Sequence, residues 1–439
     1  MSVKVRCVRQ GGSPVGRAES WAVGFDHIVH GSMDLCSVGI WLDRAMVRAY
    51  PHATMLRRDF LGHAVLFASA FPSFAKSVRA SQSAQSVWME IAQQVIQSNI
   101  SPGIQLVVMK AGVLTENIAL GFGNLETKTV VSPQSVFRIG SLTKQITCTL
   151  LLKLQSEKKL SFNDSAAKYL PFLSKHAACT IKELAQHTAG IHEEPEAPEL
   201  HGEVTQLRLA QAISEQRQFF DFPPGTAWLY SNAGYIILGA IIESVTKQSL
   251  SSVVESYLSK KLNLSNTTYD DLMPIVMGRT SGYSQTESTK QPFKNAAVID
   301  VIQSGAAGAM RSTALELATL HQALLLGSLL TPSERAELLS PSLLRNGKPS
   351  NTNRFSEQDR AMGDAHYGLG VHLDSSSTRD RSLIVHHSGF ISGFSAYLAT
   401  HIQSKTTIVC LCNVDANPRL PFRDIRRATF RDVLLTAKP

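Results

Sequence analysis

The sequence predicts a mixed α/β fold of the α+β type, with one antiparallel sheet, N- and C-terminal helices that flank it, and an inserted all-helical domain. Three patterns support this prediction. Strand-like runs occupy 103–124 and reappear after residue 365, apolar helical patterns fill most of 160–340, and an amphipathic helix is expected at each end. The simplest assembly is therefore one sheet built from both ends of the domain.

Composition and charge limit the class of protein. The chain has 439 residues, of which 44% are apolar and 18% charged, and its mean hydropathy is −0.02. These values exclude a polytopic membrane protein and a disordered one. Residues 1–80 hold ten Lys and Arg against five Asp and Glu, so most of the net charge of +8 lies outside the expected fold. The charge therefore does not indicate a nucleic-acid partner.

Residues 55–80 have the pattern of an export signal of the twin-arginine type. Arg57 and Arg58 precede an apolar stretch of about fifteen residues, which is followed by small residues. This stretch is too short and too interrupted to span a bilayer; a buried amphipathic helix is the alternative. Residues 1–54 show no sustained periodicity and are expected to be a non-native or disordered extension. We expect an exported protein, periplasmic or secreted, without a stable membrane span once the signal is removed.

The folded domain is expected at 81–435, and its sheet region consists of 86–140 and 365–435. Residues 86–97 predict an amphipathic helix, because apolar residues recur on one side. Two β-rich runs within 103–124 are joined by a Gly-containing turn and predict a hairpin.

The helical region is expected at 141–340, where Pro and Gly loops interrupt the helical patterns. The sheet region resumes at 365–435 with four strand-like runs separated by Gly, Ser and Asp. An amphipathic helix at 421–435 closes the domain.

The cysteines of the domain predict buried free thiols. Cys148 lies in a helical pattern, Cys179 stands alone, and Cys410 and Cys412 share one face of an expected strand. No Cys-x-x-Cys or Cys/His spacing typical of a metal site occurs. We therefore expect no metal and no cofactor.

One of five Ser-x-x-Lys matches stands apart from the others. Only Ser141 follows a Gly and opens a sustained apolar helix. A helix start favours developing negative charge on the hydroxyl, and positions three apart share a helix face, so Lys144 can reach Ser141. A lysine in a dry site can lose its proton near neutral pH and act as a base. A capping serine beside a solvated lysine is the alternative.

Two further motifs favour a catalytic site. Tyr230-Ser231-Asn232 lies between a Pro-Pro-Gly turn and an apolar helix, and such a tyrosine could relay a proton while Asn232 binds a substrate amide or carbonyl. His387-Ser388-Gly389 lies at the end of an expected strand. Packing of the tyrosine and surface exposure of the histidine are the alternatives for each motif alone.

The three motifs in this order resemble the serine β-lactamase and penicillin-binding-protein superfamily, in its branch of class C β-lactamases, D-Ala-D-Ala carboxypeptidases, D-aminopeptidases and related esterases. The resemblance covers roughly residues 87–435. It extends to the stretches "HTAGI", "FPPGTAWLYSN", "SGAAGAMRSTALELATLHQALL" and "YGLG". It implies the β-lactamase/transpeptidase-like fold and a serine hydrolase acting on a D-alanyl peptide, a β-lactam or an ester.

The resemblance also implies a role for each motif residue. Ser141 would be the acylated nucleophile, Lys144 its activator and Tyr230 the proton shuttle, while Asn232 would position the substrate. His387, Ser388, Gly389 and Phe390 would contribute to substrate binding along one wall of the cleft. The backbone N–H groups of Ser141 and Phe390 would form the oxyanion hole.

The third motif departs from the class C pattern. Class C β-lactamases usually carry Lys-Thr-Gly there, whereas this chain has His-Ser-Gly, and histidine is mostly neutral at neutral pH. Related peptidases and esterases often carry this histidine, so the departure weakens a prediction of antibiotic hydrolysis without arguing against catalysis.

Three other functions have less support in the sequence: an esterase with the usual nucleophile elbow, a zinc hydrolase and a sensor. No Gly-x-Ser-x-Gly and no His-Glu-x-x-His occurs, which excludes the usual esterase elbow and leaves little support for a zinc hydrolase. The serious alternative is a non-catalytic or slowly turning over sensor of penicillin or cell-wall peptide. In either case the expected partner is a small molecule or a peptide.

Overall fold

The chain divides into two units, Met1–Ser83 and Ala84–Pro439. The computed structural model describes residues 86–176, 179–193, 204–360 and 363–435, all within the second unit. The extension predicted at 1–54 and the export signal predicted at 55–80 lie outside the described residues.

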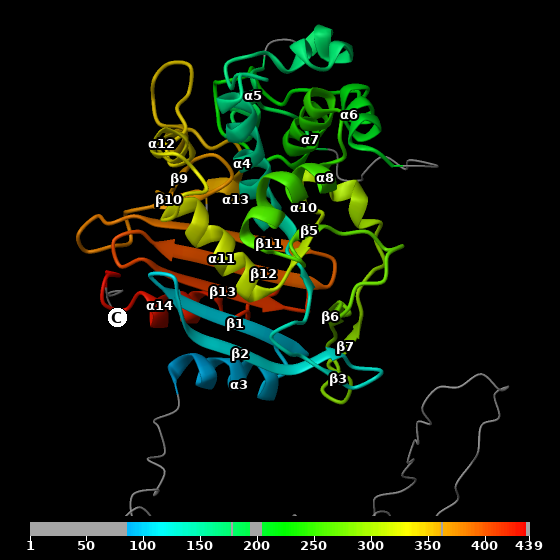
Figure 1. Cartoon of the computed structure of the whole chain (residues 1–439), viewed down its shortest axis with the longest axis vertical. Helices are drawn as coiled ribbons and strands as arrows, with labels where there is room; N and C mark the ends of the chain where they lie inside the picture. Colours follow the sequence, from blue (N-terminus) through cyan, green and yellow to red (C-terminus); the bar gives the residue numbers. More distant parts are fainter. Residues whose placement is uncertain (1–85, 177–178, 194–203, 361–362, 436–439) are drawn as a thin grey trace, which may run out of the picture. The chain divides into compact units, whose positions relative to one another are not determined.

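An eight-stranded antiparallel sheet forms the centre of the second unit (Figure 1), in the order β3-β2-β1-β13-β12-β11-β10-β9. β1 pairs with both β2 and β13, so strands from the two ends of the domain lie side by side. The fold class predicted from the sequence is therefore confirmed. The strands are β1 Gly103–Lys110, β2 Val113–Asn124, β3 Thr129–Val130, β9 His366–Tyr367, β10 His372–Asp374, β11 Ile384–Ile391, β12 Phe394–His401 and β13 Thr406–Cys412.

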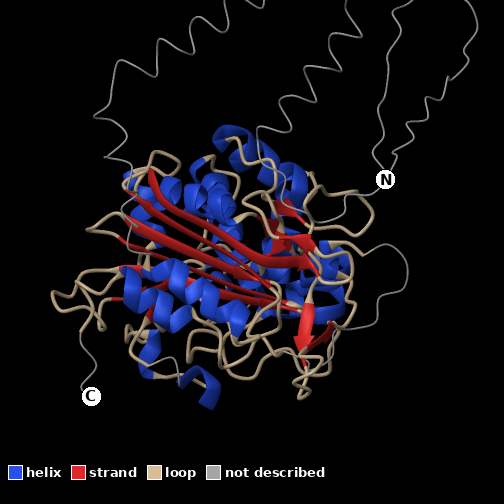
Figure 2. Cartoon of the chain, turned by 90° about the horizontal axis from the view of Figure 1, so that it is seen from below, coloured by secondary structure: helices blue, strands red, loops and turns tan. Residues whose placement is uncertain are grey.

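Alternating side chains give the sheet two buried faces. In β13, Ile408, Cys410 and Cys412 belong to one apolar core, and Val409 and Leu411 belong to the other. Helices cover both faces of the sheet (Figure 2). The terminal helices α3 (Val87–Gln97) and α14 (Phe422–Thr429) pack on the first face, and α11 (Ala314–Leu325) with the helical region packs on the second. Each core strand is therefore apolar on both sides, which explains its nearly continuous hydrophobic sequence.

The helical region stands between β4 and β9 along the chain. The main helices are α3 Val87–Gln97, α4 Thr143–Ser156, α5 Ile181–Ala185, α6 Gln206–Ser214, α7 Asn232–Thr246, α8 Leu250–Val254, α9 Lys260–Leu262, α10 Gly305–Gly308, α11 Ala314–Leu325, α12 Pro332–Leu338, α13 Glu357–Arg360 and α14 Phe422–Thr429. Short 3₁₀ turns are η2 Gly140–Leu142, η3 Ala166–Lys168, η4 Pro171–His176, η6 Val301–Ser304 and η7 Ser350–Thr352, and η5 Glu255–Ser259 is a π-helical turn.

Several short elements differ from the sequence prediction. The region expected to be helical also contains the strands β5 Thr268–Tyr269, β6 Tyr283–Gln285, β7 Phe293–Asn295 and β8 Met310–Ser312, and β4 Phe137–Arg138 pairs with β8. The run expected as one strand at 365–373 is two, β9 and β10, because Gly370 adopts a left-handed φ of +72° between them. The last helix ends at Thr429 rather than at 435.

The state of the cysteines and the presence of membrane-spanning helices can be assessed for the described residues. Cys148, Cys179, Cys410 and Cys412 are buried free thiols, as the sequence predicted. Within the described ranges, no helix has the length and apolar character needed to cross a membrane.

Candidate active site

Ser141 lies in the 3₁₀ turn η2, which leads directly into α4. The residue before it, Gly140, has a φ of +50°, and a Cβ there would lie 2.7 Å from the backbone nitrogen of Phe390. Only glycine fits such a left-handed and crowded position. The close approach holds the turn against β11, so the half-buried Ser141 stands where the sheet meets the helical region.

Lys144 is completely buried one turn after the serine. Its Nζ lies 3.2 Å from Ser141 Oγ, 2.7 Å from Asn232 Oδ1 and 2.9 Å from the carbonyl oxygen of Ala307. Burial lowers the pKa of Lys144 to about 7, against an opposing effect of the Glu193 carboxylate. The lysine is therefore half neutral near neutral pH, as a general base requires.

The partners of Lys144 determine which atom can take a proton. A neutral amine has two N–H donors and one lone pair, and the amide oxygen of Asn232 and the carbonyl of Ala307 can only accept. Both N–H groups are thereby occupied. The third contact, the Ser141 hydroxyl, is left facing the lone pair and can donate to it.

Tyr230 completes the group on the other side of the serine. Its hydroxyl is hydrogen-bonded to Ser141, and the Lys144 Nζ lies 4.7 Å from its ring centre. Burial raises the pKa of Tyr230 far above its usual range, although the bond to Ser141 opposes the shift. The phenol therefore stays protonated, so Lys144 rather than Tyr230 is suited to be the base and Tyr230 to be a proton donor.

Asn232 is placed by a helix start. Ser231 caps α7 by accepting the Gly234 N–H at 3.2 Å, which makes Asn232 the first residue of the helix. Its Oδ1 accepts from Lys144, while its backbone N–H and its Nδ2 each donate to the carboxylate of Glu193 at 2.6 Å. The structure thus brings Ser141, Lys144, Tyr230 and Asn232 into one connected group.

The third motif lies on β11, and its histidine is buried. His387 Nδ1 donates to the carbonyl of Ser388 at 2.5 Å, and Nε2 faces the Tyr367 hydroxyl at 3.1 Å. Burial, and then the neighbouring His372 and Lys144, hold the pKa of His387 well below its usual range. His387 is therefore a neutral group behind the serine, lysine and tyrosine.

The rest of the motif divides between the two faces of the strand. A Cβ on Gly389 would lie 2.0 Å from the carbonyl of Ile139 and 3.1 Å from the nitrogen of Ser141, so this strand contacts the turn η2 through backbone atoms. Side chains alternate along a strand, so Ser388 projects from the opposite face to His387. Phe390 is 46% exposed, and its ring lies 6.2 Å from that of Phe422.

Three contributors to the site were not assigned from the sequence. The His187 ring lies 4.4 Å from the Tyr230 ring, and His187 accepts a hydrogen bond from the Ser231 N–H. The Tyr367 hydroxyl is hydrogen-bonded to His387. The Glu193 carboxylate accepts a hydrogen bond from Asn232. The stretches "HTAGI" and "YGLG" contain or adjoin His187 and Tyr367, and could have indicated them. Glu193 stood only in an acidic loop and carried no such signal.

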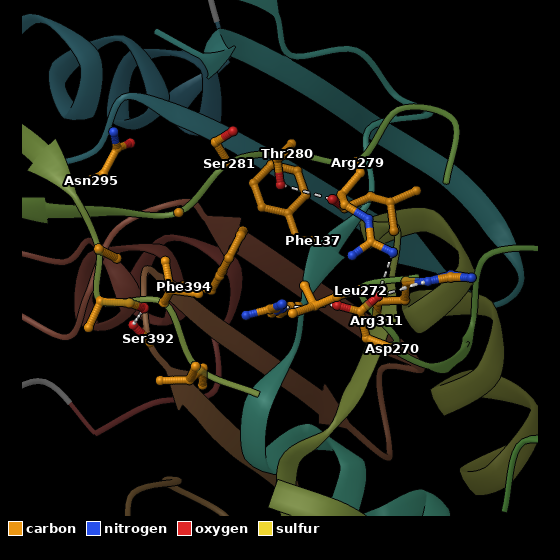
Figure 3. Close-up of a pocket in the computed structure, with 17 residues that line it drawn as sticks. Phe137, Asp270, Leu272, Arg279, Thr280, Ser281, Asn295, Arg311, Ser392 and Phe394 are labelled. Carbon is orange, nitrogen blue, oxygen red and sulfur yellow. Dashed lines mark hydrogen bonds and ion pairs between the residues drawn. The ribbon is translucent and has the colours of Figure 1, made fainter. Parts of the chain in front are cut away.

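A separate cavity of about 320 Å³ lies beside β4 and β8 (Figure 3), and Ser141 does not line it. Arg138, Arg279 and Arg311 surround the Asp270 carboxylate at 2.9, 3.1 and 3.2 Å. This carboxylate is only 2% exposed. The cluster ties the segment around 270–280 to the three-stranded sheet β4-β8-β5, which is a structural role.

Comparisons with known proteins agree with this architecture. A family model described as Beta-lactamase matches residues 90–430. Protein flp of Staphylococcus aureus strain MW2 is 25% identical over 344 residues, which cover 74% of this chain and 62% of that protein. The chain thus spans less than two thirds of the length of that relative.

Two further proteins are similar over more of their own length. The teichoic acid D-alanine hydrolase of Staphylococcus aureus strain NCTC 8325 is 25% identical over 346 residues, covering 78% of this chain and 77% of that protein. The solved structure of a D-stereospecific amidohydrolase from Streptomyces is 24% identical with a TM-score of 0.62, covering 79% of this chain and 99% of that one, a likeness that concerns the fold. Because the family match extends over most of the chain and includes the Ser141, Tyr230 and His387 motifs, the chain belongs to the Beta-lactamase family.

Proposed function

We propose that this protein is a serine hydrolase that cleaves an amide, peptide or ester substrate through an acyl-enzyme on Ser141. The observation that carries the proposal is the arrangement around Lys144, whose two N–H groups are held by acceptors while its remaining position faces the Ser141 hydroxyl. A lysine with a pKa of about 7 in this position is suited to remove the serine proton.

The reaction then runs in two halves. Ser141 Oγ attacks the substrate carbonyl carbon as its proton passes to Lys144 Nζ, and the resulting oxyanion lies against the backbone N–H groups of Ser141 and Phe390. The bond to the leaving group breaks as that group takes a proton from Tyr230, which is replenished from Lys144. Water then attacks the carbonyl carbon of the acyl-enzyme as one of its protons passes to the Lys144 and Tyr230 pair. The bond between this carbon and Ser141 Oγ breaks as Oγ takes a proton from the same pair, and the acid product leaves.

The substrate is proposed at the level of D-alanyl peptides, β-lactams and esters. The names of two similar proteins, a teichoic acid D-alanine hydrolase and a D-stereospecific amidohydrolase, support D-configured amino-acyl donors. The neutral, buried His387 supports esters and amides over β-lactams that carry a carboxylate, because it brings no positive charge to the cleft.

Intact-mass spectrometry tests the proposal directly. The protein is incubated with a panel of D-alanyl peptides, short-chain esters and β-lactams, and the reaction is quenched at several times. We expect a transient mass increase on a peptide containing Ser141 with release of product, and neither with Ser141→Ala. Undiminished hydrolysis by Ser141→Ala would contradict the proposal, and a permanent adduct without product would support a sensor instead.

We also propose that the protein is exported, on the basis of the leader pattern at 55–80. Mass spectrometry of the protein recovered from the cell envelope and from the medium should find a chain that begins between Ala75 and Ala80. A chain that retains its first eighty residues inside the cell would contradict export.

A further inference from the structure

Glu193 places a carboxylate beside the candidate active site. Its Oε2 accepts the backbone N–H of Asn232 and its Oε1 accepts Asn232 Nδ2, both at 2.6 Å. The carboxylate therefore sits at the start of α7, where the positive end of the helix dipole stabilises it. The Glu193 side chain is nevertheless exposed, so a substrate group can approach it.

A short chain of hydrogen bonds connects this carboxylate to the Ser141 hydroxyl. Asn232 joins Glu193 to Lys144, which in turn contacts Ser141 at 3.2 Å. The charge of Glu193 acts electrostatically on both Lys144 and Tyr230, raising the pKa of each, though burial is the larger effect on both residues. A charged group of the substrate near the scissile carbonyl would experience the same field.

The two hydrogen bonds to Glu193 also limit which groups of Asn232 can bind a substrate. Its Nδ2 and backbone N–H both donate to the carboxylate, and its Oδ1 accepts from Lys144. An amide oxygen on the substrate would have to compete with Glu193 for the Nδ2 donor. An ammonium group, in contrast, can bind the remaining lone pairs of the carboxylate oxygens without displacing Asn232.

Among the residues that the structure describes, the ionisable groups that surround Ser141 bring no fixed positive charge to this carboxylate. Burial holds the pKa of His187 and of His387 well below the usual range, so both rings are neutral, and Lys144 is half neutral at about pH 7. The position at which class C relatives carry lysine thus adds no cation here. Glu193 makes this side of the site attractive to positive and repellent to negative substrate groups.

We propose that Glu193 selects acyl donors that carry a free α-ammonium group, so that the preferred substrates are α-aminoacyl esters and amides rather than N-acylated peptides or carboxylate-bearing β-lactams. The α-nitrogen of such a donor is two covalent bonds from the carbonyl carbon that Ser141 attacks, which places its charge beside the Asn232 and Glu193 pair. The inference rests on the acyl-enzyme chemistry proposed above and names its substrate class.

The test compares substrates that differ only in the charge of the α-amine. D-alanine methyl ester and D-alanine amide are each assayed with the amine free and with the amine acetylated, at about pH 7, where a free α-amine is largely protonated. The selectivity is the ratio of kcat/KM for the free amine to kcat/KM for the acetylated form. It is measured in the full chain and in Glu193→Gln, Glu193→Asp and Glu215→Gln.

We expect the unchanged protein to prefer the free amine, Glu193→Gln to lose that preference by roughly ten-fold, and Glu193→Asp to retain part of it. Glu215→Gln makes the same chemical change at an exposed side chain after α6 and should leave the ratio unchanged. An unchanged ratio in Glu193→Gln would overturn the inference. If both kcat/KM values fell equally, the role of Glu193 would be only to hold Asn232 in place.

Failure of the underlying chemistry is distinguishable from failure of the inference. If the unchanged protein hydrolyses none of the four substrates and forms no adduct on Ser141 with the wider panel of peptides, esters and β-lactams, the proposed hydrolase function falls, and the inference falls with it. If it reacts with that panel but with none of the four substrates, only the inference is overturned. If it hydrolyses acetylated and free donors equally well through Ser141, the hydrolase function stands and only the role of Glu193 is overturned.

Discussion

At the scale of residues, the site depends on Lys144, a lysine that is completely buried in the fold. The Ser-x-x-Lys spacing was enough to predict that Lys144 reaches Ser141, because both are on one helix face. The two acceptors that orient the amine, Asn232 and Ala307, lie 88 and 163 positions further along the chain. No local pattern contains that information, so the depressed pKa could be anticipated in direction but not explained from the sequence.

The pKa of Lys144 predicts an acid limb in the rate. A group that acts as a base in its neutral form is inactivated by protonation, so kcat/KM should fall about ten-fold for each pH unit below about 7. A pH-rate profile with an uncharged ester substrate measures this limb. A profile that stays flat down to about pH 5 would exclude neutral Lys144 as the base.

Tyr230 should be needed for turnover rather than for folding. Tyr230→Phe keeps the half-buried ring against His187 but removes the hydroxyl bonded to Ser141, so we expect kcat to fall by about 10²- to 10⁴-fold. Single-turnover kinetics would measure the loss. Tyr257→Phe, which removes a hydroxyl bonded to Glu157 at the opposite end of α4 from Lys144, is the matched control, and equal effects of the two changes would contradict the role of Tyr230.

At the scale of elements, Ser141 is held by close packing between the turn η2 and strand β11. Glycines at 140 and 389 let the two backbones meet without side chains between them. The long strands are nearly continuous β-rich runs and the terminal helices follow the helical period, so the sequence predicted both. The strands β4 to β8 have two or three residues each, too few to show a period, and they could not be predicted.

Alanine at position 389 tests this contact. In Gly389→Ala the new Cβ would lie 2.0 Å from the Ile139 carbonyl, so β11 must move away from η2. We expect a lower thermal midpoint and loss of acyl-enzyme formation. Gly234→Ala, inside α7 with its nearest atom at 3.6 Å, should instead stabilise the fold by about 0.5–1 kcal/mol and keep activity, and similar thermal midpoints for the two variants would contradict the argument.

At the scale of the whole molecule, several histidines are buried without charge. His187, His321 and His387 are each at most 3% exposed, and burial lowers the pKa of all three, to about 3 for His321. The unfolded chain therefore binds more protons than the folded one at pH values below the ordinary histidine pKa of about 6.5. The free energy of unfolding must decrease as the pH falls below that value.

Acid sensitivity should be measurable and partly removable. Lowering the pH from about 7.5 to about 5 should cost about 2 kcal/mol for each such histidine, read from urea unfolding at the two pH values. His321→Gln keeps a hydrogen-bonding group toward Thr400, whose Oγ1 lies 2.7 Å from His321 Nδ1, but cannot titrate. It should therefore lose less stability on acidification, and an unchanged difference would count against the argument.

The pairing of β1 with β13 has a consequence for the order of the chain. The helices next to these strands, α3 and α14, touch one another, and Trp88 Nε1 donates to Thr429 Oγ1 at 3.0 Å. The described backbone from 86 to 435 therefore begins and ends at neighbouring helices. A short linker between Ser86 and Leu435, with new ends at the exposed turn of Gly347, should give a circular permutant that folds to the same sheet and reacts at the same serine.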